Sequence, residues 1–138
     1  MNNSHGQNEI SKDGLIRLVA EAKQVTAYFA AWSGGLADDS MLCAVPIYFQ
    51  WVEIAEQAIH MMAHDADHDA RNKLAERLIN VLIVPINGMI QAIHMYGKNN
   101  NIALPPIDNV PQEIHAYKDW GIDYITRSLV VLKEANKS

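Results

Sequence analysis

The sequence predicts an all-α protein, an antiparallel four-helix bundle, and three observations lead to this fold class. Apolar side chains recur at alternating spacings of three and four residues in four long segments. No segment alternates apolar and polar residues in the way a half-buried strand does. With 138 residues, of which 49% are hydrophobic and 20% charged, the chain has room for one core. We expect a flexible tail over 1–10 and a single helical domain over 11–138.

The first helix is expected over residues 11–33. Ser11 can cap it, and Asp13 lies in its first turn, where the positive end of the helix dipole favours an acidic side chain. Gly34 and Gly35 follow, and glycine ends helices by taking the left-handed conformation at little cost. The apolar seam of this helix consists of Leu15, Leu18, Ala22, Val25, Phe29 and Trp32.

The second helix is expected over residues 40–64, after the candidate caps Asp38, Asp39 and Ser40. Pro46 lies near its start, so the regular helix either begins there or bends there. This helix has two apolar stripes, and so broad an apolar surface indicates burial on two sides, or one side that faces a partner. Its two apolar stripes are Leu42, Val45, Phe49, Val52 and Ile59, and beside them Met41, Tyr48, Trp51, Ala55, Ala58 and Met62.

The third helix is expected over residues 69–97, with a kink near Pro85 and its end at Gly97. Proline removes one backbone donor and leaves the Val81 carbonyl without its usual partner. Three amides share one side of this helix, and we expect them to satisfy that carbonyl and fix the helix register, or else to line a groove or partner contact. These amides are Asn80, Asn87 and Gln91.

Residues 78–96 of the third helix contain no Asp, Glu, Lys or Arg, a pattern that also raises the possibility of a membrane span. Polar and helix-breaking residues interrupt the stretch, however, which argues against a surface that faces lipid. We therefore expect a helix at the centre of a small bundle and no membrane span. The interrupting residues are Asn80, Pro85, Asn87, Gly88, Gln91 and His94.

The fourth helix is expected over residues 111–135. The connection before it contains Pro105 and Pro106, and prolines disfavour helix, so we expect this connection to be extended. Asn109 with Gln112 three residues later resembles a capping box, and a proline at position 111 suits a first helical turn.

The composition excludes several classes of function. The formal charge is −5, from 11 Lys and Arg against 16 Asp and Glu, and no basic cluster stands out, so we expect no general nucleic-acid binding. Cys43 is the single cysteine, which excludes an internal disulfide and a cysteine-based zinc cluster. No secretory signal pattern is present at the start of the chain, so we expect a cytoplasmic location.

One cluster could bind a divalent cation. Four side chains are the candidate ligands, because an i, i+4 histidine pair on a helix can present two imidazoles to zinc. These candidates are His60, His64, Asp67 and His68. The stretch from Asp65 also resembles a calcium loop of the EF-hand family, but Ala70 stands where that loop needs glycine, so zinc is preferred to calcium. The alternative is that Asp67 or Asp69 simply caps the third helix.

Two hypotheses for function follow. The first is a small acidic protein-binding module of the inhibitor, immunity or assembly-subunit type, which binds a protein partner or associates with itself. Tyr48, Trp51 and Trp120 are its candidate contact residues, because large aromatic residues near polar neighbours often anchor interfaces. The second is a bundle that binds a divalent metal ion or another ligand through residues 60–69. No motif indicates catalysis or another cofactor.

Overall fold

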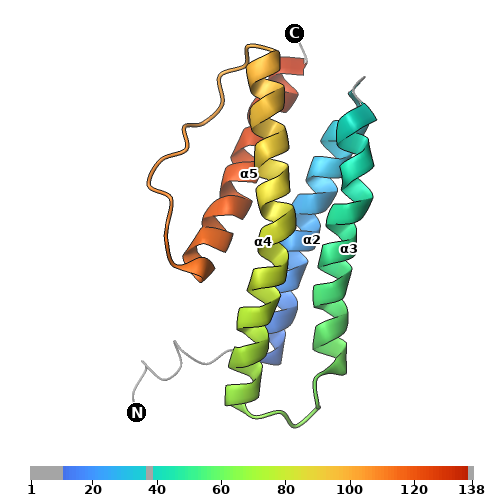
Figure 1. The fold of residues 1–138 in the computed structure, drawn as a ribbon, viewed down its shortest axis with the longest axis vertical. Helices are drawn as coiled ribbons and strands as arrows, with labels where there is room; N and C mark the ends of the chain where they lie inside the picture. The colour runs from blue at the N-terminus through green and yellow to red at the C-terminus, as the bar shows by residue number, and fades with distance from the viewer. Residues whose placement is uncertain (1–10, 37–38, 137–138) are drawn as a thin grey trace.

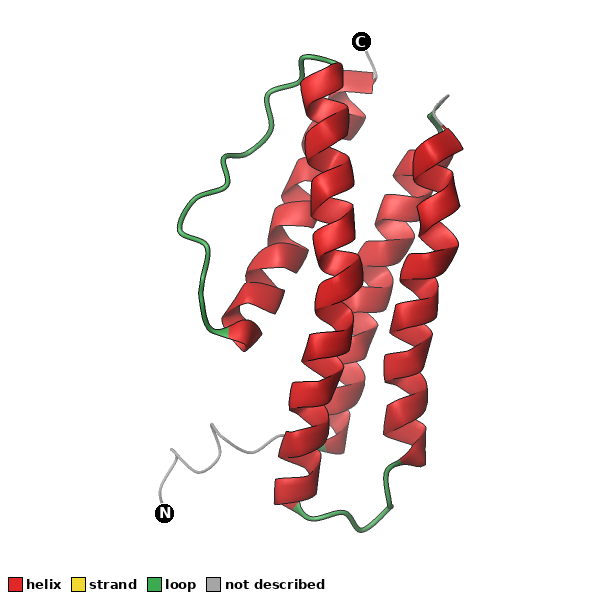
Figure 2. Ribbon diagram, viewed as in Figure 1, coloured by secondary structure: helices red, strands yellow, loops and turns green. Residues whose placement is uncertain are grey.

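The protein, seen in a computed structural model, is described over residues 11–36 and 39–136, and this part of the chain consists of helices and loops with no strand (Figure 2). Four helices form in the order α2 (Lys12–Gly34), α3 (Asp39–Met61), α4 (His68–Asn99) and α5 (Ile114–Asn136). The predicted four-helix bundle is therefore confirmed. The predicted tail, the candidate cap Asp38 and the Cys43 side chain lie outside the described residues.

Consecutive helices run antiparallel from α2 to α4, but α5 runs parallel to α4 (Figure 1). Side-chain contacts give the same direction. Asn87 of α4 contacts Tyr117 of α5, and seven residues later in both helices His94 contacts Tyr124. The bundle thus departs from the predicted antiparallel order at its last helix. The cause is the connection between α4 and α5, which runs back along the outside of the bundle before α5 begins.

The core lies where all four helices meet, and its largest fully buried side chains come from α2, α4 and α5. α2 and α4 lie at the centre of the arrangement, because each contacts the other three helices, whereas the described parts of α3 and α5 show no close backbone approach to each other. The predicted seam of α2 is buried along its whole length. The largest fully buried side chains are Tyr124, Phe29, Leu15, Leu78, Ile79, Leu82, Ile86, Met89, Ile93, Ile125, Leu132 and Val19.

Two helix starts follow the capping signals in the sequence. The Gly14 amide donates to Ser11 Oγ over 3.0 Å, and the Ala70 amide donates to Asp67 Oδ1 over 2.8 Å. These bonds satisfy backbone donors that have no partner inside the helix. At the other end of α2, Gly35 is the cap with φ −89° and ψ 0°, so the helix ends at the predicted place without the predicted left-handed residue.

Gly97 has a different role from the predicted one, since α4 continues past it to Asn99. A Cβ at this buried position would lie 2.6 Å from Leu104 Cδ1, and the Ile102 amide donates to the Gly97 carbonyl over 2.9 Å. The glycine therefore lets the following connection pass close to the end of the helix. The chain turns at Asn101, whose φ of 56° is one that asparagine tolerates better than most residues.

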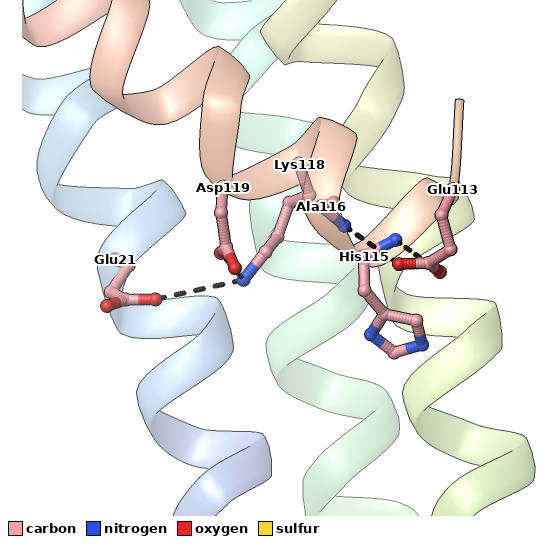
Figure 3. Close-up of polar contacts among 6 residues, drawn as sticks. All are labelled: Glu21, Glu113, His115, Ala116, Lys118 and Asp119. Carbon is pink, nitrogen blue, oxygen red and sulfur yellow. Dashed lines mark hydrogen bonds and ion pairs between the residues drawn. The ribbon is translucent and has the colours of Figure 1, made fainter. Parts of the chain in front are cut away.

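The start of α5 also differs from the prediction. Asn109 has a φ of 53°, which is not the extended conformation of an N-cap, and the helix begins at Ile114 rather than at 111. The cap is Glu113 (Figure 3): its carboxylate accepts from the amides of His115 over 2.9 Å and Ala116 over 3.1 Å. These two bonds favour the charged form and lower the pKa of Glu113 from its ordinary value of 4.5.

This cap gives a pH-dependent prediction. We expect Glu113→Ala to melt at a lower temperature than the wild type near neutral pH, because two amides at the start of α5 lose their acceptor. Since the folded-state pKa is below 4.5, the stabilisation is present above that pH and is lost as the pH falls through the folded-state value. Melting curves at a series of pH values test this. A temperature difference that stays constant at every pH would contradict it.

Both internal prolines lie inside continuous helices, Pro46 in α3 and Pro85 in α4. Pro85 is buried, and the kink expected there stays a prediction. Judged by length and composition alone, α4 could cross a membrane, and among the described helices it is the one that meets this criterion. The core helix of a soluble protein passes the same test, and 44% of its most apolar window is buried in the bundle.

The three amides of α4 have separate roles. Asn87 Oδ1 accepts a hydrogen bond from the Tyr117 hydroxyl, so this amide fixes the register of α4 against α5. Asn80 is exposed and donates to the Glu76 carbonyl over 3.0 Å, rather than to that of Val81. Gln91 is exposed as well. The predicted structural role therefore holds for Asn87.

Candidate functional site

The structure separates the four predicted metal ligands over the end of α3, the turn and the start of α4. His60 lies on α3, His64 lies in the turn, Asp67 caps α4 and His68 is its first residue. Because α3 ends at Met61 and not at 64, the two histidines are not one helical turn apart on a continuous helix. The helix that the expected i, i+4 pair of His60 and His64 requires therefore does not extend to residue 64.

Two charged side chains in the first turn of α4 make local contacts. Asp69 pairs with Lys73 over 3.5 Å, and Arg71 Nη1 donates to the Ala66 carbonyl over 2.7 Å. Over residues 11–36 and 39–136, no three His, Cys, Asp or Glu side chains are grouped so that they could hold a metal ion. A divalent cation at residues 60–69 stays a prediction, and the observed role of Asp67 is the cap.

The predicted contact residues Tyr48 and Trp120 are half-buried and pack inside the bundle. The Tyr48 ring meets Phe29 edge to face, with centroids 5.9 Å apart, and it lies so close to Gly88 that a Cβ there would be 2.7 Å from it. Trp120 stacks on Tyr124, with centroids 5.3 Å apart. Tyr48 therefore joins α3 to α2 and α4, whereas the Trp120 stack lies within α5 and packs against the core.

The ring of Tyr124 belongs to a stack that joins α4, α5 and their connection. His94 stacks on Tyr124 at 5.9 Å, and its Nε2 lies 2.9 Å from the tyrosine hydroxyl. That hydroxyl donates its proton to the Pro105 carbonyl over 2.8 Å, so Nε2 of His94 must carry the hydrogen of the other bond. Burial raises the pKa of Tyr124 above its ordinary value of 10.0, so the hydroxyl keeps its proton. The stack is a structural support for the connection.

A row of exposed apolar side chains runs along α3. Ile47, Ile54 and Met61 are spaced seven residues apart and are 52%, 50% and 85% exposed. Trp51 and Ala58 lie between them and are half-buried. The resulting spacings of four and three residues place all five side chains on one side of the helix. Sequence reasoning named Trp51 as a contact residue, and the structure places it in this row.

The same surface continues onto α4. Val81 and Val84 precede Gly88 by seven and four residues, so they share the side of α4 on which Gly88 meets Tyr48 of α3. Val81 is half-buried and Val84 is 45% exposed. α3 and α4 lie side by side toward the viewer in Figure 1. We call this surface the α3–α4 face and define it by Ile47, Trp51, Ile54, Ala58, Met61, Val81 and Val84.

The apolar row itself contains no charged residue, and the exposed Glu53 lies beside Gln50 and Gln57 on its border. Gln50 and Gln57 are exposed on the outward side of α3, and Gln91 is exposed on α4. Arg77, four residues before Val81, is exposed at one end. The chain as a whole has a formal charge of −5. The face is therefore an uncharged, apolar area on an acidic protein.

A second feature is a groove of about 570 Å³ between α2 and α5. Lys118 lies in it with only 7% of its side chain exposed, and its ammonium group is 2.7 Å from Asp119 Oδ1 and 3.8 Å from Glu21 Oε1 (Figure 3). Asp123, which also lines the groove, pairs with Arg127 over 2.9 Å. Lys118 and Asp123 therefore both have charged partners within the protein.

A smaller apolar pocket of about 340 Å³ lies between α2 and α3. Lys23 and Glu56 pair across it over 3.4 Å, and His60 stands at its border. It therefore places His60 beside apolar side chains of α2 rather than beside the other predicted ligands.

Comparison of the chain with known protein families, with curated proteins and with solved structures finds no match. The function therefore has to be inferred from the surface of this chain.

Sequence reasoning did not identify the exposed row of α3. It assigned Tyr48, Trp51 and Ala58 to one of two apolar stripes and included neither Ile47 nor Ile54. The signal was present, because isoleucine, isoleucine and methionine recur at an interval of seven residues. A helix with three apolar stripes has more apolar surface than one core can cover, so one stripe had to face outward.

Proposed function

We propose that this protein is a protein-binding module and that it binds through the α3–α4 face. The observation that supports the proposal is the row of Ile47, Ile54 and Met61, each at least half exposed and in line on one helix. Single exposed apolar residues are ordinary on protein surfaces, whereas a continuous apolar area with a polar border is typical of an interaction site. Inhibitors, immunity proteins and assembly subunits act by such contacts.

The composition of the face also supports protein binding. Interfaces are depleted of charged residues in their centre and enriched in tryptophan and methionine, and the face has Trp51 near its middle and Met61 at one end. Glutamines border it, and their amides can exchange hydrogen bonds with a partner without the cost of burying a charge. The proposal does not include a metal ion, because Asp67 caps α4 and the four predicted ligands are divided between α3, the turn and α4.

Site-specific photocrosslinking tests this proposal. A photoreactive amino acid is placed at Gln50 or Gln57, which border the face, and as a control at Val130, which is 58% exposed on α5. We expect the two face positions to give discrete protein adducts in the native host and the control position to give none. Equal labelling at all three positions, or no adduct at any of them, would contradict a role for this face in protein binding.

A further inference from the structure

We propose that the α3–α4 face binds a second copy of this chain, with α3 of each copy packed antiparallel on α3 of the other. The inference rests on the proposed function and names the partner. It depends on the pattern of side chains along α3 and on the absence of charge from that row.

The exposed row of α3 has the spacing of a coiled-coil seam. Ile47, Ile54 and Met61 occupy one of the two seam positions of the heptad, and Trp51 and Ala58 occupy the other. Ala44, which is half-buried, continues the second position toward the start of the helix. A seam that packs on a copy of itself forms a closed twofold contact, the commonest symmetry of protein assemblies.

An antiparallel pair gives each alanine of this seam a larger partner and places Trp51 against Ile54 at its centre. Antiparallel coiled coils place the two seam positions opposite each other, which aligns Trp51 with Ile54 of the second copy. The same register aligns Ile47 with Ala58 and Met61 with Ala44, because in each pair the residue numbers add to the same value. Alternation of large and small residues across the contact fills the space between the helices without overlap.

The bordering residues fit the same register. Gln50 of one copy lies beside Gln57 of the other, twice in the symmetric pair, and two amides can donate to and accept from each other. No carboxylate lies in the seam, so two copies of a chain with a charge of −5 can approach here without local repulsion. Their overall charges still repel, and we expect added salt to strengthen the association by screening them.

A dimer contact of ordinary size would extend beyond the apolar residues of the face. The chain has an accessible surface of 8455 Å². A specific interface buries about 800 Å² on each partner, roughly a tenth of the surface of a small protein. The seven side chains of the face would supply the centre of such a contact, and the bordering glutamines would supply its rim.

Sedimentation velocity over a range of concentrations tests the inference. We expect the full chain to shift from 15.4 kDa toward twice that mass as the concentration rises. Ile54→Glu should weaken the association by roughly a hundredfold or more, because two isoleucines leave the contact and two charges enter it in each dimer. Val130→Glu, an equally exposed change on α5, should leave it unaffected. Circular dichroism checks that both variants keep the helical fold.

A disulfide test checks the register separately. In a Cys43→Ser background, the double variant Ile47→Cys with Ala58→Cys should give a covalent dimer on mild oxidation, and each single variant should not. The two positions lie eleven residues apart on one rigid helix, about 16 Å, so they cannot be bridged within one chain.

The outcomes separate this inference from the proposed function. A wild type that stays monomeric at every concentration overturns the second copy as the partner, while photocrosslinked adducts of another mass still support protein binding. A dimer that forms equally well with Ile54→Glu overturns the assignment to this face. A dimer that fails the disulfide test while Ile54→Glu abolishes it overturns the antiparallel register.

Discussion

Phe29→Ala is expected to lower the free energy of unfolding by about 3–5 kcal/mol, a large share of the roughly 5–15 kcal/mol that a domain of this size has. Phe29 is fully buried and meets both Trp32 and Tyr48 edge to face, with centroids 5.6 and 5.9 Å apart. Alanine leaves a cavity between α2 and α3 and removes both aromatic contacts. The half-buried Tyr48 then loses its support against Gly88.

Denaturant unfolding followed by circular dichroism measures this effect. The matched control is Tyr28→Ala. It removes an aromatic ring from the preceding position of the same helix, where the side chain is 44% exposed. We expect the control to cost much less than Phe29→Ala, since little buried surface is lost. Equal losses for the two variants would mean that the face of α2 assigned to the core is incorrect.

Gly121→Leu is the second substitution with a large expected effect. Gly121 is buried on α5 where that helix meets α4, and a Cβ there would lie 2.6 Å from Ile86 Cγ2. That methyl group is attached to the branched Cβ of a fully buried isoleucine, so it cannot swing aside. Overpacking of this kind costs about 1–3 kcal/mol or more, and a leucine adds three further carbons to the clash.

The intermediate variant Gly121→Ala separates the two opposing effects. Alanine stabilises a helix interior by about 1 kcal/mol relative to glycine, so a net loss of stability in this variant measures the clash. Gly34→Leu is the control, because no atom lies within 4 Å of a Cβ at that helical position. We expect stability to fall from wild type to Gly121→Ala to Gly121→Leu, with Gly34→Leu near wild type. A stabilised Gly121→Leu would show that α5 does not pack closely on Ile86.

The helices themselves could be predicted because their signals are local. The seam of α2 follows from the spacing of its apolar residues, and its start follows from Ser11, whose side chain bonds within three residues. Asp67 was likewise recognisable as a candidate cap. Its hydrogen bond with the Ala70 amide supports that role rather than the role of a metal ligand.

The direction of α5 could not be predicted, because it depends on contacts between distant residues. The path of the connection is held where Tyr124 donates to Pro105 and where Leu104 packs against Gly97, and nothing near these residues in the sequence indicates such pairs. The capping box at Asn109 was a plausible local pattern, but the returning chain places Glu113 at the start of the helix instead.

The candidate site was predicted only in part for a related reason. Apolar residues on α3 look alike in the sequence whether they face the core or the solvent, so Tyr48 and Trp51 could be marked as interface residues on equal grounds. Tyr48 proves to be wedged against Phe29, and Trp51 lies on the outer row with Ile54. Only the placement of α2 and α4 decides which stripe is covered.

The return of the connection between α4 and α5 has a consequence for linking this domain to others. Because the last two helices, α4 and α5, are parallel, α2 begins at one pole of the bundle and α5 ends at the other (Figure 1). Domains attached to these two helix ends would be held apart by the length of a helix of 23 residues, about 35 Å. An up-and-down bundle of the same size would bring such attachments together at one pole, whereas this topology would keep them at opposite poles.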